Sequence, residues 1–323
     1  MHTDTTTLRE IGLRTIRLEA EAVAGLAEQV NEDFAAVARL LFGMKGRLVV
    51  SGIGKSAIIG QKIVATFNST GTPAIFMHAA DAIHGDLGMI QEGDVVMVIS
   101  KSGESPEIKV LVPLIRNLRH PLVGMVGQME SFLALHSDYV LNTTVSQEAC
   151  PNNLAPTTST TAQLVMGDAL AVVLMEMRGF GREDFAKFHP GGALGKKLYL
   201  RVADLYVQNE RPFVWADSTL KDVILEISRK RLGITAVIDA EQHLLGVITD
   251  GDLRRMLEKE SDVRQVTASA IMSRNPRTIG AEELAVNALD IMRKNNITQL
   301  IVSENGAYAG VIHLHDLIKE GLI

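Results

Sequence analysis

A short apolar run passes directly into a glycine-rich loop in Arg47-Leu-Val-Val-Ser51-Gly-Ile-Gly54-Lys55-Ser56. The β-branched residues predict a buried strand, and the glycines predict a tight turn at the start of a helix. Four similar runs follow at intervals that leave room for helices: Ala74-Ile-Phe-Met77, Asp94-Val-Val-Met-Val-Ile99, Leu122-Val-Gly-Met-Val126 and Tyr139-Val-Leu-Asn142. This alternation predicts an α/β fold in which helices cover both faces of a parallel sheet.

Ligands of such folds bind outside the carboxyl ends of the strands, so the residues after each run are candidates for a binding site. A second polar loop, Ser100-Lys-Ser-Gly-Glu-Ser105-Pro106-Glu107, directly follows the third run. The hydroxyls of Ser100, Ser102 and Ser105 can converge on one phosphate. Pro106 suits the first position of a helix, Ser105 its N-cap and Glu107 its first turn. Two such loops on one sheet predict a phosphate site.

The first loop by itself has three interpretations. A Walker phosphate loop is excluded because Val49 stands where its first glycine belongs. A relaxed dinucleotide fingerprint fits Gly52-x-Gly54-x-x-Ala57, although Asp81 lies further along the chain than the ribose-binding acid of that motif. The third interpretation is a tight strand-to-helix turn with an exposed Lys55. The second loop favours a phosphate ligand, since a dinucleotide fold does not require it.

Composition excludes several classes of partner. The formal net charge is -6 and charges of both signs are interspersed, so no basic stripe is available for nucleic acid. The single cysteine, Cys150, agrees with a reducing compartment. The segment Met1 to Thr7 has neither the basic start nor the apolar stretch of an export signal. We expect a cytoplasmic protein without a nucleic-acid or membrane partner.

Helical periodicity appears in two other places. Leu8 to Leu41 has apolar residues at helical spacing and predicts one or two amphipathic helices. Ala162 to Met177 is the most apolar helix candidate, but three polar residues interrupt it and it is too short to span a bilayer. We predict a buried helix there, with hydroxyls of Thr157-Thr-Ser-Thr-Thr161 available to cap it.

A repeat begins after about residue 203. Leu220, Ile227, Gly246-Val-Ile248 and Asp252-Leu253 recur at a constant offset as Leu284, Ile291, Gly310-Val-Ile312 and Asp316-Leu317. Each copy is predicted to run helix, strand, turn, strand, helix, and to bury its apolar face against the other copy. We expect Tyr199 to Trp215 to be the linker that leads into the first copy.

Seven ordered motifs point to one family. They are Ser51-Gly-Ile-Gly-Lys-Ser56, Ala65-Thr-Phe-Asn-Ser-Thr-Gly-Thr-Pro73, His84-Gly-Asp-Leu-Gly88, Ser100-Lys-Ser-Gly-Glu-Ser105, Glu148-Ala-Cys-Pro151, Leu154-Ala-Pro-Thr-Thr-Ser-Thr-Thr161 and His189-Pro-Gly-Gly-Ala-Leu-Gly195. Over nearly the whole chain the sequence resembles the bacterial arabinose-5-phosphate isomerases. The resemblance implies a sugar isomerase (SIS) domain over residues 1–200, then two cystathionine-β-synthase (CBS) modules over residues 204–265 and 266–323.

The resemblance also implies an activity, the interconversion of D-ribulose 5-phosphate and D-arabinose 5-phosphate, which feeds Kdo and lipopolysaccharide biosynthesis. Moving a carbonyl between neighbouring carbons needs a base, a stabilised enediolate and return of the proton. No cofactor is required for this chemistry. SIS sites commonly borrow residues across subunits, so the family implies a homo-oligomer, and we expect a homotetramer.

The family's catalytic positions correspond to Lys55, Glu107, Glu148 and His189. Lys55 is the candidate to stabilise the enediolate oxygen or a phosphate. Glu148 and His189 are candidates for carbon proton transfer and for moving protons among oxygens or opening a sugar ring, and the sequence does not divide these roles. Plainer interpretations stay open: a solvated loop carboxylate for Glu148, and a surface acid at a helix start for Glu107. The Pro-Gly-Gly that follows His189 predicts a displayed imidazole.

The family also implies a set of substrate contacts. They are Ser56, Gly71, Thr72, His78, His84, Ser100, Ser102, Ser105, Thr144, Val145 and Ser146. His78 is in addition a candidate zinc contact, at which zinc would inhibit rather than catalyse. Packing or substrate contact is the plainer role for His78 and His84, because two histidines six residues apart are a poor metal signature. Lys101 departs from the family pattern, in which asparagine is common.

The two CBS modules leave their ligand open. In modules that bind adenosine nucleotides, a Thr or Ser and an Asp after the second strand hold the ribose. The first copy has Thr249-Asp-Gly-Asp252, whereas the second has His313 in place of the hydroxyl residue and keeps Asp316. The pair is therefore expected either to bind a nucleotide or a nucleotide-linked sugar such as CMP-Kdo, or mainly to stabilise an oligomer.

Three other functions compete with the main prediction. An isomerase of another short-chain ketose phosphate would use the same serine loops. A sugar-phosphate-sensing regulator is the second alternative, although the chain has no basic helix-turn-helix segment ahead of the SIS region. A nicotinamide-dependent oxidoreductase would need an acid at the ribose position, which the sequence lacks.

Overall fold

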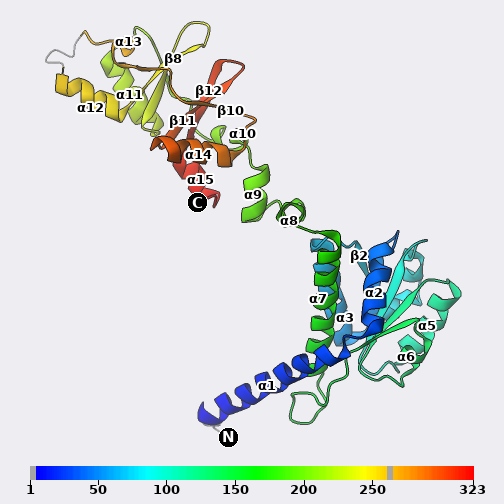
Figure 1. Cartoon of the computed structure of the whole chain (residues 1–323). Helices are drawn as coiled ribbons and strands as arrows, with labels where there is room; N and C mark the ends of the chain where they lie inside the picture. The colour runs from blue at the N-terminus through cyan, green and yellow to red at the C-terminus, as the bar shows by residue number, and fades with distance from the viewer. Residues whose placement is uncertain (1–4, 260–264) are drawn as a thin grey trace. The chain divides into compact units, whose positions relative to one another are not determined.

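The computed structural model describes residues 5–259 and 265–323, and the chain divides into two compact units. The first unit runs through Phe188, and the second is His189–Ile323. Figure 1 shows an α/β unit that contains α1 to α8, and a second unit that contains the later strands and helices.

The first unit is built on a five-stranded parallel sheet. Its strands are β1 (Leu48–Gly52), β2 (Ala74–His78), β3 (Val95–Ser100), β4 (Leu122–Val126) and β5 (Tyr139–Asn142). Their order across the sheet is β2-β1-β3-β4-β5, and every neighbouring pair is parallel. The five apolar runs of the sequence are these five strands to within one residue at each end, so the predicted parallel sheet is confirmed.

Helices cover both faces of this sheet. They are α1 (Thr5–Gly25), the 3-10 helix η1 (Leu26–Gln29), α2 (Glu32–Gly43), α3 (Gly54–Ser69), α4 (Ala79–Ala82), η2 (Asp86–Met89), α5 (Pro106–Asn117), α6 (Phe132–His136), α7 (Thr158–Arg178) and α8 (Arg182–Phe188). Strand side chains alternate between two cores: Leu48 and Val50 pack with α2, α3 and α7, whereas Val49 packs with α4, α5 and α6. The strands are buried on both faces, as their continuous apolar runs require.

The long apolar helix α7 belongs to the first of these cores. Within the part of the chain that the structure describes, α7 alone has the length and apolar composition of a membrane span, and half of its apolar window is buried. Gly167 allows a close approach to α3, because a Cβ there would lie 2.5 Å from Ile63 side-chain atoms. The prediction of a buried helix is confirmed, but the expectation that it is too short to span a bilayer is wrong, because α7 extends beyond the predicted segment at both ends.

The second unit contains two copies of one motif. Its elements are α9 (Ala193–Tyr199), α10 (Val202–Tyr206), β6 (Phe213–Trp215), α11 (Leu220–Lys230), β7 (Ile234–Ile238), β8 (Leu244–Thr249), α12 (Asp250–Lys259), α13 (Ala268–Ile271), β9 (Ser273–Arg274), β10 (Thr278–Gly280), α14 (Ala285–Asn295), β11 (Gln299–Glu304), β12 (Ala307–His313) and α15 (Leu314–Lys319). The sheets are β6-β7-β8-β9 and β10-β11-β12. Both copies have the predicted order of helix, strand, strand, helix.

The copies share apolar contacts, which confirms that each buries a face against the other. Ile234 and Val247 of the first copy lie in one cluster with Ile301 and Tyr308 of the second. The hairpin between β7 and β8 is closed by Asp239, whose carboxylate accepts hydrogen bonds from the backbone N–H groups of Glu241 and His243 at 3.1 and 2.8 Å.

The prediction of a simple linker into the first copy is wrong in its first half. Val202 and Leu205 of α10 lie in the core of the second copy, beside Leu289 and Leu300. Conversely, Ala268 of α13 packs in the core of the first copy. Each copy is thus completed by the segment that precedes the other in sequence. The apolar side chains of α10 decide this, because they are buried only where the second copy offers a matching face.

Candidate active site

Two polar loops meet where the strand order of the sheet reverses. The chain passes from β1 to β2 on one side and then returns to β3 on the other, so the carboxyl ends of β1 and β3 are neighbours, with Gly52 paired to Ile99. A crevice at such a reversal is the usual ligand site of open α/β sheets. The loops predicted to bind phosphate therefore lie side by side.

The first loop is shaped by its glycines. A Cβ on Gly52 would lie 3.2 Å from backbone atoms of Ser56, and Gly54 has φ +58°. Helix α3 begins at Gly54, which leaves the Lys55 side chain exposed in the first turn. The hydroxyl of Ser56 donates a hydrogen bond of 3.2 Å to Oε1 of Gln163 on α7.

The second loop presents hydroxyl donors. The Ser100 Oγ accepts the N–H of Gly103 at 3.0 Å, and the Ser102 Oγ accepts the N–H of Glu104 at 3.3 Å. Because both oxygens act as acceptors inside the loop, their hydroxyl hydrogens remain available to a ligand. Gly103 has φ +65°, the left-handed conformation that the turn requires.

The start of α5 agrees with the sequence prediction except in its cap. Pro106 is in the first helical turn, and Glu107 is half-buried there. Ser105 holds the N-cap position, but its side chain makes no capping hydrogen bond. Among the described residues its buried Oγ is without a hydrogen-bond partner. The predicted N-cap position is confirmed without a capping bond, and the Ser105 hydroxyl remains a possible donor to a ligand.

Glu148 has a fully buried side chain, held by two segments. Its Oε1 accepts the Ser159 hydroxyl at 2.5 Å and lies 2.6 Å from the Lys101 Nζ. Its Oε2 accepts the backbone N–H groups of Thr157 and Ser159 at 2.8 and 3.1 Å. Burial by itself would raise the pKa of this carboxyl, but the hydrogen bonds from Lys101, Ser159 and the helix backbone lower its pKa to about 2.

Glu148 therefore caps α7. Thr157 occupies the N-cap position of this helix but its own side chain makes no capping bond, so the prediction of a threonine cap is wrong. A carboxylate nine residues earlier replaces it, and it also complements the positive end of the helix. The interpretation of Glu148 as a solvated loop residue is contradicted by its burial.

Gln163 was not predicted as a site residue. Its side chain is buried, its Oε1 accepts the Ser56 hydroxyl, and its Nε2 is an unpaired donor among the described residues. Gln163 thus joins α7 to the first loop, and Glu148, which caps α7, pairs with Lys101 of the second loop. The sequence carried a signal for it, because Gln163 is one of the polar residues that interrupt the apolar helix.

Other predicted contacts lie at different edges of the sheet. Gly71 and Thr72 precede β2, and the guanidinium of Arg178 donates hydrogen bonds to both. This is the amino edge of the sheet, so the chain does not bring them together with the serine loops. Thr144, Val145 and Ser146 follow β5 at the carboxyl edge; Thr144 donates to Asn142, and Val145 packs on the core.

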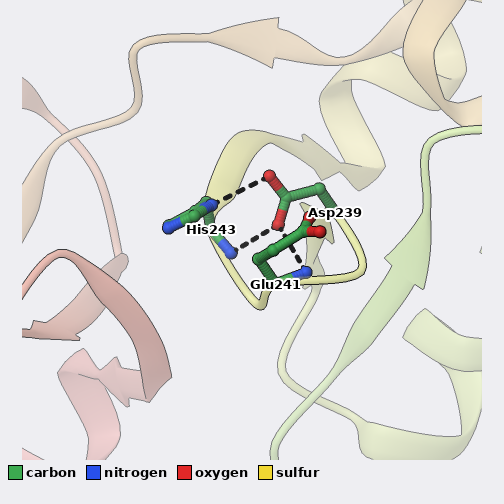
Figure 2. Close-up of side chains that lie close together, drawn as sticks. All are labelled: Asp239, Glu241 and His243. Atoms are coloured by element: carbon green, nitrogen blue, oxygen red, sulfur yellow. Dashed lines mark hydrogen bonds and ion pairs between the residues drawn. The ribbon is translucent and has the colours of Figure 1, made fainter.

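The two histidines predicted near the substrate lie at the end of β2, of which His78 is the last residue, and after it. His78 is half-buried, with its Nδ1 3.7 Å from an Asp81 carboxylate oxygen, and His84 is exposed before Gly85. Within residues 5–259 and 265–323, His78 belongs to no group of three metal-ligating side chains. Among the same residues, Asp239, Glu241 and His243 do form such a group of three (Figure 2), but their mutual hydrogen bonds are those of a hairpin turn.

His189 is the first residue of the second unit and lies between α8 and α9, outside either helix, as predicted. Its carbonyl oxygen accepts the N–H of Gly192 at 3.1 Å. A Cβ on Gly195 in α9 would lie 2.3 Å from the same oxygen, so glycine is required sterically at position 195.

The residues predicted to hold a ribose in the first CBS copy are bonded to one another. The Thr249 hydroxyl donates to Asp252 at 2.7 Å, and Asp252 also accepts from Arg255 and Ser273 at 2.5 and 3.1 Å. In the second copy the Nδ1 of His313 accepts the N–H of His315 at 3.0 Å. The histidine thus replaces the threonine as the cap of the following helix.

Comparison with known proteins gives a consistent result. Residues 41–173 match the SIS domain family, and residues 202–259 and 268–322 match the CBS domain family. Arabinose 5-phosphate isomerase KdsD of Escherichia coli (strain K12) is 45% identical over 316 residues, which are 98% of this chain and 96% of the relative. The Pseudomonas aeruginosa protein of the same name is 48% identical over 312 residues, 96% of each chain.

A solved structure, that of Escherichia coli CFT073 c3406 in complex with arabinose 5-phosphate, is 38% identical to the matching part of this chain. It covers 58% of this chain and 100% of its own, with a TM-score of 0.57.

Proposed function

The chain belongs to the arabinose 5-phosphate isomerase family, and we propose that it interconverts D-ribulose 5-phosphate and D-arabinose 5-phosphate through an enediolate. The observation that carries this proposal is the pair of polar loops at the carboxyl ends of β1 and β3, with a buried carboxylate beside them. Hydroxyl donors there suit a phosphate, and the reaction requires no cofactor.

In this proposal each residue of the site has a separate role in phosphate binding, charge stabilisation or proton transfer. Ser100, Ser102 and Ser105 donate to the phosphate, and Lys55 stabilises the negative charge that develops on the enediolate oxygen. With a pKa of about 2, Glu148 is ionised at neutral pH and is a weak proton acceptor. We therefore assign the carbon proton to His189, whose imidazole can act as a general base and then return the proton as a general acid. Glu107 is left as the candidate for proton movement among the sugar oxygens.

We further propose a cytoplasmic homotetramer that supplies Kdo and lipopolysaccharide biosynthesis. The exposed apolar side chains of α1 support association with other copies, and the free Cys150 agrees with a reducing compartment. In this proposal zinc at His78 inhibits the enzyme, and the CBS modules bind a nucleotide or a nucleotide-linked sugar.

One assay tests the activity. Purified protein is incubated with ribulose 5-phosphate without added cofactor, and the products are separated and identified. We expect arabinose 5-phosphate to form, and no product from unphosphorylated ribulose. Turnover of a different ketose phosphate instead would favour the alternative isomerase, and binding without turnover would favour a sugar-phosphate sensor.

A further inference from the structure

Lys101 joins the second loop to Glu148, the residue that caps α7. It stands between Ser100 and Ser102, and its Nζ lies 2.6 Å from the Glu148 Oε1. The side chain of Glu148 is 0% exposed, whereas that of Lys101 is 41% exposed. The ammonium therefore lies between a buried carboxylate and the open side of the loop.

The position of Lys101 is fixed at its backbone. Its carbonyl oxygen accepts the N–H of Gly127 at 3.0 Å, and a Cβ on Gly127 would lie 3.3 Å from the Lys101 Cγ. The loop is braced further on, where the N–H of Leu133 donates to Gly103 and the N–H of Phe132 donates to the Glu104 carboxylate. The backbone from which the Lys101 side chain extends is thus held in place by these hydrogen bonds.

The charges explain why a cation is needed there. An ionised Glu148 next to a loop that binds phosphate would repel the incoming dianion, since like charges at short range disfavour each other. An ammonium has three donors, and Glu148 accepts one of them. The other two N–H donors of the Lys101 ammonium belong to the same loop as the available hydroxyl hydrogens of Ser100 and Ser102.

We propose that Lys101 is a phosphate-binding and positioning residue, which holds the Glu148 carboxylate with one N–H and donates another to the phosphate of the sugar. It shields the phosphate from the carboxylate at the same time. This inference rests on the proposed function for the identity of the ligand, but its consequence for phosphate affinity does not require turnover.

A double-mutant cycle separates this role from simple packing. The variants are Lys101→Met, Glu148→Gln and the pair, and inorganic phosphate is titrated into each by calorimetry. We expect Lys101→Met to weaken phosphate binding roughly tenfold or more, because a charged hydrogen bond is lost and the carboxylate is unshielded. The pair should recover part of this loss, since removal of the Glu148 charge removes the repulsion.

Two further variants control the result. Lys101→Arg keeps the charge and should retain most of the affinity. Lys62→Met is the matched control, because Lys62 also forms an ion pair with a residue of α7: its Nζ lies 2.5 Å from an Asp168 carboxylate oxygen on the surface. This variant should bind phosphate like the parent protein. With ribulose 5-phosphate, Lys101→Met should raise KM more than it lowers kcat.

If Lys101→Met alone fails to fold, the double variant Lys101→Met with Glu148→Gln is measured in its place, because the double variant leaves no unpaired buried charge. Unchanged phosphate affinity in Lys101→Met, or in the pair where the single variant cannot be measured, would overturn the inference. So would equal losses in Lys101→Met and the pair. An inactive parent protein that still shows these affinity changes would instead remove only the proposed reaction.

Discussion

At the scale of single residues, Glu148 has a structural role beyond the catalytic one that its family position implies. It caps α7 with two backbone bonds and pairs with Lys101. We expect Glu148→Gln to lower the free energy of unfolding at pH 7 by on the order of 1 to 3 kcal/mol, because charged hydrogen bonds become neutral ones. Chemical denaturation of the parent and the variant measures this difference.

The pH dependence of that difference has a definite sign. The pKa of Glu148 is lowered from 4.5 to about 2 by folding, so its stabilising effect is present above pH 4.5 and is lost as the pH falls towards 2. The gap between the parent and Glu148→Gln should therefore narrow over this window. A gap that stays constant from pH 7 to pH 2 would show that the carboxylate charge does not matter.

His189 provides the contrasting case. It directly follows α8, in the turn that precedes α9. We expect His189→Ala to lower kcat by roughly 10²- to 10⁴-fold, the usual contribution of a general acid or base. The melting temperature should change little. Near-normal turnover of ribulose 5-phosphate would remove His189 from the catalytic set.

At the scale of elements, the cap of α15 depends on the protonation state of a histidine. The Nδ1 of His313 accepts the N–H of His315, and the His313 N–H donates to Asp316 at 2.8 Å. Burial, assisted by His315, lowers the pKa of His313 below 6.5, although Asp316 opposes this. The stability that depends on the neutral ring is thus present above pH 6.5 and is lost as the pH falls through the lowered value.

We expect His313→Thr to remove this acid sensitivity, because the equivalent Thr249 caps α12 through its hydroxyl. Between pH 7.5 and 5 the variant should lose less stability than the parent, by about 0.5 to 2 kcal/mol, the value of one cap. Calorimetric scans of the full chain measure it. Asp316→Asn should destabilise at both pH values, and equal acid sensitivity of His313→Thr and the parent would contradict the expectation.

At the scale of the whole molecule, α1 indicates assembly. Four of its large apolar side chains are exposed, among them Leu8 at 57% and Ile16 at 68%. We expect Leu8→Glu with Ile16→Glu to convert the proposed tetramer into smaller species, as seen by size-exclusion chromatography with light scattering. Arg14→Glu is the matched charge control on the same helix and should leave the assembly intact. An unchanged mass in the double variant would exclude α1 from the interface.

Local sequence patterns are sufficient to predict the strands, the parallel α/β class, the repeat and the two polar loops. These follow from local periodicity and from glycine and proline positions, which act within a few residues. Three contacts could not be predicted in this way: Glu148 caps α7, Lys101 pairs with Glu148, and α10 completes the second copy. The last two contacts join residues far apart in the chain, whereas Glu148 lies nine residues before Thr157 in an irregular segment. Burial and charge select all three contacts only after the elements have packed.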